Sequence, residues 1–344
     1  MERRLPLFLT VFVTFAGISI QSCSIGSGEK QKASEHDSLM PDNVESSLFE
    51  SALEEDFDEI EQDCNMTVDW DNNSFFFNIY DGEASVTSKN ESDTMVIPCK
   101  VIKDGKEYPV TSVSFAGFED CINLKSISIS ENVSSIVDRA FYGCTGLTSV
   151  SLPNVEELGQ CAFCWCTELA AIDMPNVEVI GRAAFKATGL SSITIPNGVK
   201  IIGPYAFYDC ANLSVADVPE SVEEIGERAF SRNPNLLSVN VDKNNERYSS
   251  IDGVLYSKNQ DTLLLCPQKK EVVELPSSVK VIGISAFESC GKLTSITIPN
   301  SCYNIGSEAF CNCPNLDITI DNREEDVKIG SGAFLNCKSV KFLR

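Results

Sequence analysis

The dominant feature of this sequence is a unit of 22–24 residues that recurs from residue 111 to the C-terminus. Aligned on one Phe per unit, the nine copies are separated by 23, 22, 22, 22, 23, 57, 23 and 24 residues. A unit this short cannot bury its own apolar face, so copies must stack and share one core. The sequence therefore predicts a solenoid over residues 111–344, and we number its rungs one to nine by Phe118, Phe141, Phe163, Phe185, Phe207, Phe230, Phe287, Phe310 and Phe334.

Each unit also predicts its own local structure. A segment of the form Leu-x-x-Ile-x-Ile alternates with period two, which is typical of a strand, and Pro often follows it. Ala precedes the Phe in eight units and Cys follows it by three residues in seven. We expect the segment around Phe to return the chain as a short helical turn. The predicted fold is a solenoid of α/β type, with a ladder of parallel strands about 4.8 Å apart.

The unit resembles the repeat of the BspA-like branch of the leucine-rich-repeat class. The segment Leu293–Pro299, the Ile305-Gly306 pair and Ala309-Phe310 with Cys313 match that repeat nearly residue by residue. The family often carries a hairpin island, which the insertion at about 242–275 resembles, with Asp252-Gly253 as its turn. Residues 64–110 resemble the family's β-rich leader, which would cap the first rung. The resemblance implies a bacterial surface protein that adheres to host proteins or to other cells.

The N-terminus carries the features of an export signal. Residues 1–22 join Arg3 and Arg4 to an apolar run that is shorter than a membrane span. They end before Cys23, which resembles the lipidated Cys of bacterial lipoproteins. Residues 23–63 are acidic and poor in apolar residues, which predicts a flexible tether. We therefore expect an exported chain, anchored to the outer membrane or cell surface only by a lipid on Cys23.

Composition excludes several classes of function. The net charge of −23 makes nucleic acid an unsuitable partner, because phosphate binding needs clustered bases. The single histidine, His36, lies in the predicted tether and has no rigid partner that would make it a catalytic base. Neither a phosphate-binding loop nor a Gly-x-Ser-x-Gly motif is present. We expect no enzyme activity and no cofactor.

The fifteen cysteines divide into structural and unassigned residues. Seven occupy the repeat position after Phe, and Cys302 stands where other rungs have Val, so all eight are expected to be buried small residues. Cys161, Cys164 and Cys166 have ligand-like spacing but no obvious fourth ligand, and we expect no metal site. An exported chain can form disulfides, and the best candidate pair is Cys64 with Cys99.

Function must then come from surfaces, and two candidates stand out. The outward slots of the strand segments form a small, polar stripe, which is either a binding face or a solvated sheet face; its residues are Ser128, Ser151, Asp173, Thr194, Asp217, Asn240 and Thr297. The candidate aromatic anchors are Tyr248, Tyr256 and Trp165.

The leading hypothesis is a cell-surface binding protein without catalysis, whose ligands are proteins or glycans on host or neighbouring cells. The alternatives are an accessory protein of an outer-membrane uptake complex and, third, a carboxylate-based hydrolase.

Overall fold

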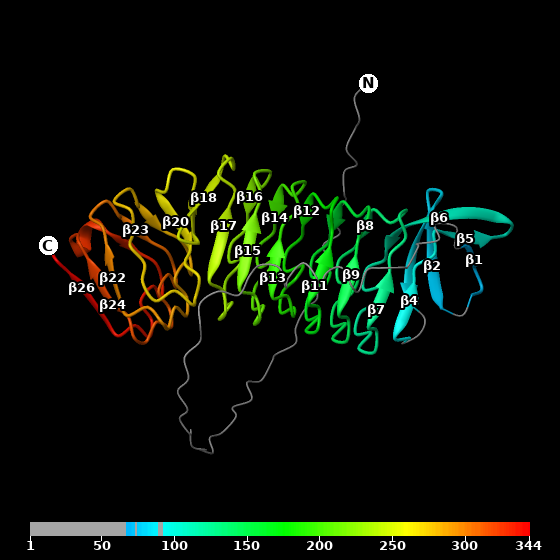
Figure 1. The fold of residues 1–344 in the computed structure, drawn as a ribbon, viewed down its shortest axis with the longest axis horizontal. Helices are drawn as coiled ribbons and strands as arrows, with labels where there is room; N and C mark the ends of the chain where they lie inside the picture. Colours follow the sequence, from blue (N-terminus) through cyan, green and yellow to red (C-terminus); the bar gives the residue numbers. More distant parts are fainter. Residues whose placement is uncertain (1–66, 73, 89–91) are drawn as a thin grey trace, which may run out of the picture. The chain divides into compact units, whose positions relative to one another are not determined.

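The computed structural model describes residues 67–72, 74–88 and 92–344 (Figure 1). All of them belong to one compact unit, Glu61–Arg344. Cys23, Cys64, His36 and the whole of the predicted signal and tether lie outside the described residues, so these predictions stay predictions. In the part of the chain that is described, no helix has the length and apolar character needed to cross a membrane.

The leader is built of strands that continue into the repeats. β2 and β3 form an antiparallel hairpin around the Asp81-Gly82 turn. β6 then pairs in parallel with the first short repeat strand, β8, and β4 pairs with the first long one, β7. That the leader caps the first rung stays a prediction. The leader strands are β1 (Thr67–Asp69), β2 (Phe75–Tyr80), β3 (Glu83–Ser88), β4 (Thr94–Val96), β5 (Lys100–Lys103) and β6 (Lys106–Val113).

Each repeat contributes one long and one short strand, and most strands pair in parallel with the strand of the same kind in a neighbouring rung; the long strands of rungs three and four do not pair, and neither kind pairs between rungs six and seven. The predicted parallel ladder is therefore confirmed, and Figure 1 shows these strands side by side in chain order. The long strands are β7 (Ser126–Ser128), β9 (Ser149–Ser151), β11 (Ala171–Asp173), β13 (Ser192–Thr194), β15 (Val215–Val218), β17 (Ser238–Val241), β22 (Ser295–Ile298), β24 (Asp317–Ile320) and β26 (Ser339–Phe342). The short strands are β8 (Ser135–Ile136), β10 (Glu157–Leu158), β12 (Val179–Ile180), β14 (Ile201–Ile202), β16 (Glu224–Ile225), β21 (Val281–Ile282), β23 (Asn304–Ile305) and β25 (Lys328–Ile329).

The prediction that the chain returns through short helical turns is wrong. The chain around each Phe forms hydrogen-bonded turns, and the one helix in the described ranges is a 3-10 segment, η1 (Glu324–Asp326). The residues two before and two after the Phe have φ between 51° and 70° in all nine rungs. A left-handed residue at every fourth position prevents an α-helix, which needs φ near −63°. We call the five residues centred on each Phe the turn of that rung.

The turns stack through their rings and their backbone. Consecutive Phe rings within rungs one to six, and within rungs seven to nine, are stacked with centroids 4.7–5.9 Å apart. The first, third and fifth N–H groups of a turn donate to carbonyls of the next rung; in rung four, for example, Phe185 N donates to Ala206 O at 2.8 Å. Such close approach requires glycine before the turn, since a Cβ on Gly203 would lie 2.7 Å from the backbone of Gly181.

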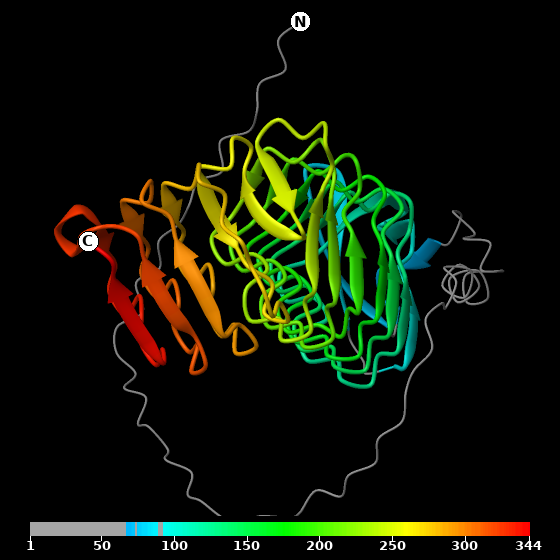
Figure 2. The same cartoon turned by 60° about the vertical axis from the view of Figure 1, so that its left-hand side comes forward.

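The inserted residues interrupt the stack between rungs six and seven. β18 (Tyr248–Ile251) and β19 (Val254–Ser257) form a hairpin, and β20 (Thr262–Leu265) joins β19 to β21. Leu255 belongs to the apolar core of the leader and rungs one to six, whereas Val254 and Tyr256 belong to the separate core of the later rungs. The island thus lies between two cores; Figure 2 shows it in yellow between the green and the orange rungs.

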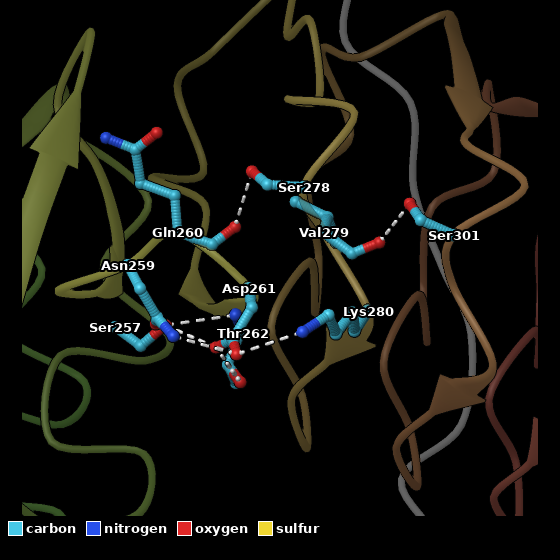
Figure 3. A network of polar contacts seen from close by, with 9 residues as sticks. All are labelled: Ser257, Asn259, Gln260, Asp261, Thr262, Ser278, Val279, Lys280 and Ser301. Carbon is cyan, nitrogen blue, oxygen red and sulfur yellow. Dashed lines mark hydrogen bonds and ion pairs between the residues drawn. The ribbon is translucent and has the colours of Figure 1, made fainter.

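A polar network fastens the island to rung seven (Figure 3). The Asp261 carboxylate accepts hydrogen bonds from Ser257 Oγ at 3.0 Å and Asn259 Nδ2 at 2.9 Å, and Lys280 Nζ lies 3.8 Å away. The Asp261 carbonyl accepts from the N–H of Lys280 at 2.7 Å. The hydrogen bond from Ser257 is the main reason that the pKa of Asp261 lies below its usual value.

Candidate functional site

The structure places the predicted stripe residues on long strands of three separate sheets, in register within each sheet. Ser151 stands opposite Ser128 and Asp173, and Asp217 stands opposite Thr194 and Asn240. Thr297 stands on β22, which belongs to another sheet. Several members bind one another: Ser151 Oγ donates to Asp173 at 3.1 Å, and Asn240 Nδ2 donates to Asp217 at 2.8 Å. The stripe exists as a surface, and its use in binding stays a prediction.

The three candidate aromatic anchors differ in exposure. Tyr256 is 1% exposed, so the expectation that it anchors a partner is wrong. The alternation of β19 directs Tyr256 to the same side as Val254, into the second core. Tyr248 is half-buried, and its hydroxyl accepts a hydrogen bond from Ile225 N at 2.8 Å, so its polar end is held within the fold. Of the three candidate anchors, only Trp165 is exposed, at 43%.

A group of aromatic and basic side chains, which the strand positions alone do not reveal, occupies the turns next to that of Trp165. They come from the turns of rungs two to five and from the residue just before the turn of rung four. We call this group the turn-face cluster; it comprises Arg139, Tyr142, Trp165, Arg182, Lys186, Tyr205 and Tyr208. All seven are half-buried or exposed. The sequence did contain a signal for this cluster. The residues at the repeat positions on either side of Phe vary from rung to rung, unlike the constant core positions.

Several members of the turn-face cluster contact one another, either within a turn or between rungs four and five. Arg139 lies over the Tyr142 ring at 4.0 Å from its centroid, and Arg182 lies over the Tyr205 ring at 5.0 Å. Tyr205 and Tyr208 meet edge to face with centroids 5.3 Å apart. Such cation–aromatic contacts hold the long side chains in place, which lowers the entropy lost when a partner binds.

The turn-face cluster also differs from the rest of the chain in charge. It contains three bases and no acid, whereas the whole chain has a net charge of −23. Arg139 forms an ion pair with Glu119, and its hydrogen bond with that carboxylate raises the pKa of Arg139. Arg182 and Lys186 have no ion pair within the described residues. Their charges are therefore available to an acidic partner.

The cysteines offer little reactive chemistry. In five rungs the repeat thiol donates to the Phe carbonyl of the preceding rung, as from Cys166 Sγ to Phe141 O at 3.1 Å. Burial raises the pKa of Cys164 to about 12, so this thiol stays protonated at neutral pH. Among the described residues, no three acidic, Cys or His side chains are placed to hold a metal ion. Cys99 is buried; because Cys64 is not described, their pairing stays a prediction.

Comparisons with known proteins agree on the architecture. The family model for the BspA type leucine rich repeat region matches residues 107–214, 136–256 and 265–344, with six copies. No match was found among curated proteins.

Several solved structures are similar over most of the chain. A leucine-rich repeat protein from Bacteroides ovatus is 25% identical, with a TM-score of 0.63, covering 79% of this chain and 76% of that one. A leucine rich cell surface protein from Faecalibacterium prausnitzii is 24% identical, with a TM-score of 0.57, covering 79% and 94%. The pneumococcal vaccine antigen PcpA is 19% identical, with a TM-score of 0.55, covering 79% and 80%. The last two similarities concern the fold alone.

Proposed function

Because the chain belongs to the BspA-type leucine-rich-repeat family, we propose that it is a lipid-anchored cell-surface protein that binds other proteins through its turn-face cluster. The observation that carries this proposal is the gathering of Trp, Tyr and Arg side chains in successive turns. These residue types dominate the binding energy of protein interfaces. The stripe, by contrast, contains none of them.

The chemistry of the turn-face cluster favours an acidic protein segment as the partner. Arg182 and Lys186 supply unpaired positive charge, and Trp165, Tyr205 and Tyr208 supply flat apolar area beside it. In this proposal the partner is a protein on a host or neighbouring cell, and the chain acts in adhesion without catalysis.

The binding test compares two faces of the same molecule. The immobilised full-length chain is exposed to protein fractions from host surfaces and bacterial envelopes, and retained proteins are titrated. Replacing Trp165, Arg182 and Tyr205 by Ala should weaken binding at least about tenfold, because each hot-spot residue contributes more than about 1 kcal/mol. The control variant replaces Ser151, Thr194 and Asn240 by Ala and should bind like the wild type.

Two results would contradict the proposal. Loss of binding only in the stripe variant would assign the interaction to the stripe. If the wild-type chain retained no protein from any fraction, the result would count against a binding function. Retention of a transporter subunit in place of a host protein would support the accessory role instead.

The lipid anchor is tested separately. Cells grown with a fatty-acid analogue should label the wild-type chain and leave Cys23→Ala unlabelled, since the thiol of Cys23 is the proposed attachment point. Equal labelling of both chains would refute the anchor and leave the binding proposal untouched.

A further inference from the structure

The turn of rung six ends its ladder without a partner. In rung five, the N–H groups of Tyr205, Phe207 and Asp209 all donate to carbonyls of rung six, at 2.7–3.2 Å. The other rungs with a following rung repeat this pattern. In rung six, the equivalent N–H groups of Arg228, Phe230 and Arg232 have no acceptor within the described structure. Three parallel donors therefore face the interruption.

The island explains why these donors are open. Cys266 occupies the position that the Phe of a preceding rung would have relative to rung seven. Its N–H donates to Ala286 O at 2.7 Å, as the Phe N–H of a full rung does to the next rung. Gln268 Nε2 supplies a second donor, to Glu288 O at 2.8 Å. After Cys266 the chain leaves the stack at Pro267 without forming a full turn. The island therefore presents no carbonyl groups to the N–H groups of rung six. On the opposite wall, the Ile284 carbonyl has no donor among the described residues.

A cavity of about 160 Å³ lies between these walls. Its apolar lining includes Phe230 from rung six, Leu255, Leu264 and Leu265 from the island, and Ile284 from rung seven. Arg228 also lines it, so the open N–H groups of Arg228 and Phe230 belong to residues of the cavity wall. A cavity of about 150 Å³ holds a benzene-sized group, so this one has room for one apolar side chain.

Buried polar atoms without partners gather at the same place. Across the described residues, four buried side-chain polar atoms have no hydrogen-bond partner, and three of them belong to Arg228, Ser285 and Glu288. Ser285 is 1% exposed. Buried polar groups are normally satisfied, so such a concentration marks the interruption as a place with room for further polar partners.

Charge at the interruption argues against a small anion. Arg228 forms an ion pair with Glu308 of rung eight, and Glu227 and Glu288 lie close to it. The ligand must therefore offer acceptors to one wall, donors to the other and an apolar group to the cavity, without a strong net charge. A polypeptide backbone meets these demands.

We propose that the interruption between rungs six and seven is a binding site for a peptide segment of a partner protein. The carbonyls of alternate peptide residues accept hydrogen bonds from the N–H groups of Arg228, Phe230 and Arg232. A peptide N–H donates to the Ile284 carbonyl, and one apolar side chain occupies the cavity. The peptide thereby completes the turn that the island lacks, in the manner of strand addition to an open edge. This site is separate from the turn-face cluster and does not depend on it.

The chain itself supplies a rational probe. In the folded protein, Gly203–Asp209 presents the carbonyls of Pro204, Ala206 and Tyr208 to an equivalent set of N–H groups in rung four. A capped peptide of that sequence, Gly-Pro-Tyr-Ala-Phe-Tyr-Asp, is added to the full-length chain, and amide hydrogen exchange is followed by residue. Exchange at Arg228, Phe230 and Arg232 should slow at least about tenfold. The all-D peptide is the control and should have no effect.

Two variants and one internal reference make the test decisive. Leu264→Trp fills the cavity and should abolish the protection, whereas Leu237→Trp, at an exposed position outside the cavity, should preserve it. Rung nine is the last rung of the described residues; the N–H groups of its turn likewise have no acceptor there, but it does not border this cavity, so the peptide should leave it unchanged. Absent protection in rung six, equal protection in rung nine, or full protection in Leu264→Trp would overturn the proposal. Normal exchange at Phe207 in each variant establishes that the fold is intact.

Discussion

Rungs one to six and rungs seven to nine are built from the same unit, but in the described residues the first group is joined to the leader and stops at the cavity beside the island, whereas the second group starts there. Within each group, Phe rings stack and every turn is bonded to the next. Between Phe230 and Phe287 both connections stop, and the island supplies a partial substitute. The comparison shows that the unit specifies stacking, whereas the insertion specifies where stacking ends.

The largest expected difference concerns the Phe column. Phe185 is stacked on both sides, whereas Phe230 is stacked on Phe207 and borders the cavity on its other side. Phe185→Ala should lower the free energy of unfolding by about 3–5 kcal/mol, with a smaller loss for Phe230→Ala. Denaturant titration measures both, and equal losses would mean that the interruption is as well packed as the stack.

Glycine before the turn provides the next comparison. A Cβ on Gly203 would meet backbone at 2.7 Å, whereas one on Gly283 would meet the Leu263 carbonyl oxygen of the island at 2.9 Å. Gly203→Ala should cost about 1–3 kcal/mol through overpacking, and Gly283→Ala should cost less. Gly291→Ala, with nothing within 4 Å, serves as the neutral control. A larger loss at Gly283 would show that the island fits more tightly than a rung.

Amide hydrogen exchange in the unsubstituted protein tests whether the N–H groups in the turn of rung six lack an acceptor. The N–H of Phe207 is bonded to the Ala229 carbonyl, and the N–H of Phe230 has no acceptor among the described residues. In the free protein, Phe230 should exchange roughly tenfold faster than Phe207. Similar rates would indicate that an acceptor closes the turn of rung six in solution.

The smallest effect is expected at the attachment of the island. Hydrogen bonding lowers the pKa of Asp261 in the folded state, so its stabilising contribution is present above the unfolded pKa of about 3.9 and is lost as pH falls through the folded value. Asp261→Asn should therefore be less stable than the wild type at pH 7, and the two should converge in acid. Unfolding midpoints between pH 7 and pH 2 measure this, and a constant difference would contradict it.

Much of the fold could be predicted because repeated apolar columns constrain stacking directly. The sequence also holds an irregularity from which no prediction was drawn: Leu190 comes one residue early, and the described strands β11 and β13 of the adjoining rungs are not paired. The turn conformation could not be predicted in this way. Its left-handed positions hold residues as different as Arg139, Trp165 and Asp209, which lack the Gly or Asn signature of such backbone.

The candidate site was harder to predict because exposure depends on the turn conformation. The helical return that was expected gave no reason to treat the residues beside Phe as one surface. In the observed turn conformation, Arg182 lies over the Tyr205 ring of the next rung and Lys186 lies over its Tyr208 ring. The role of Asn233 could not be predicted from the sequence either. It replaces the repeat Cys, and its side chain forms hydrogen bonds with Cys210 N, Phe207 O and Phe230 O.

The division of the apolar interior at the island has a mechanical consequence. Rungs seven to nine share a core with one side of the hairpin, and rungs one to six share a core with the other. Repeat arrays gain cooperativity from interfaces between neighbours, so a weak interface separates two blocks that open independently. A load applied between the two ends of this chain would unravel the three distal rungs in a first event, before the larger block yields.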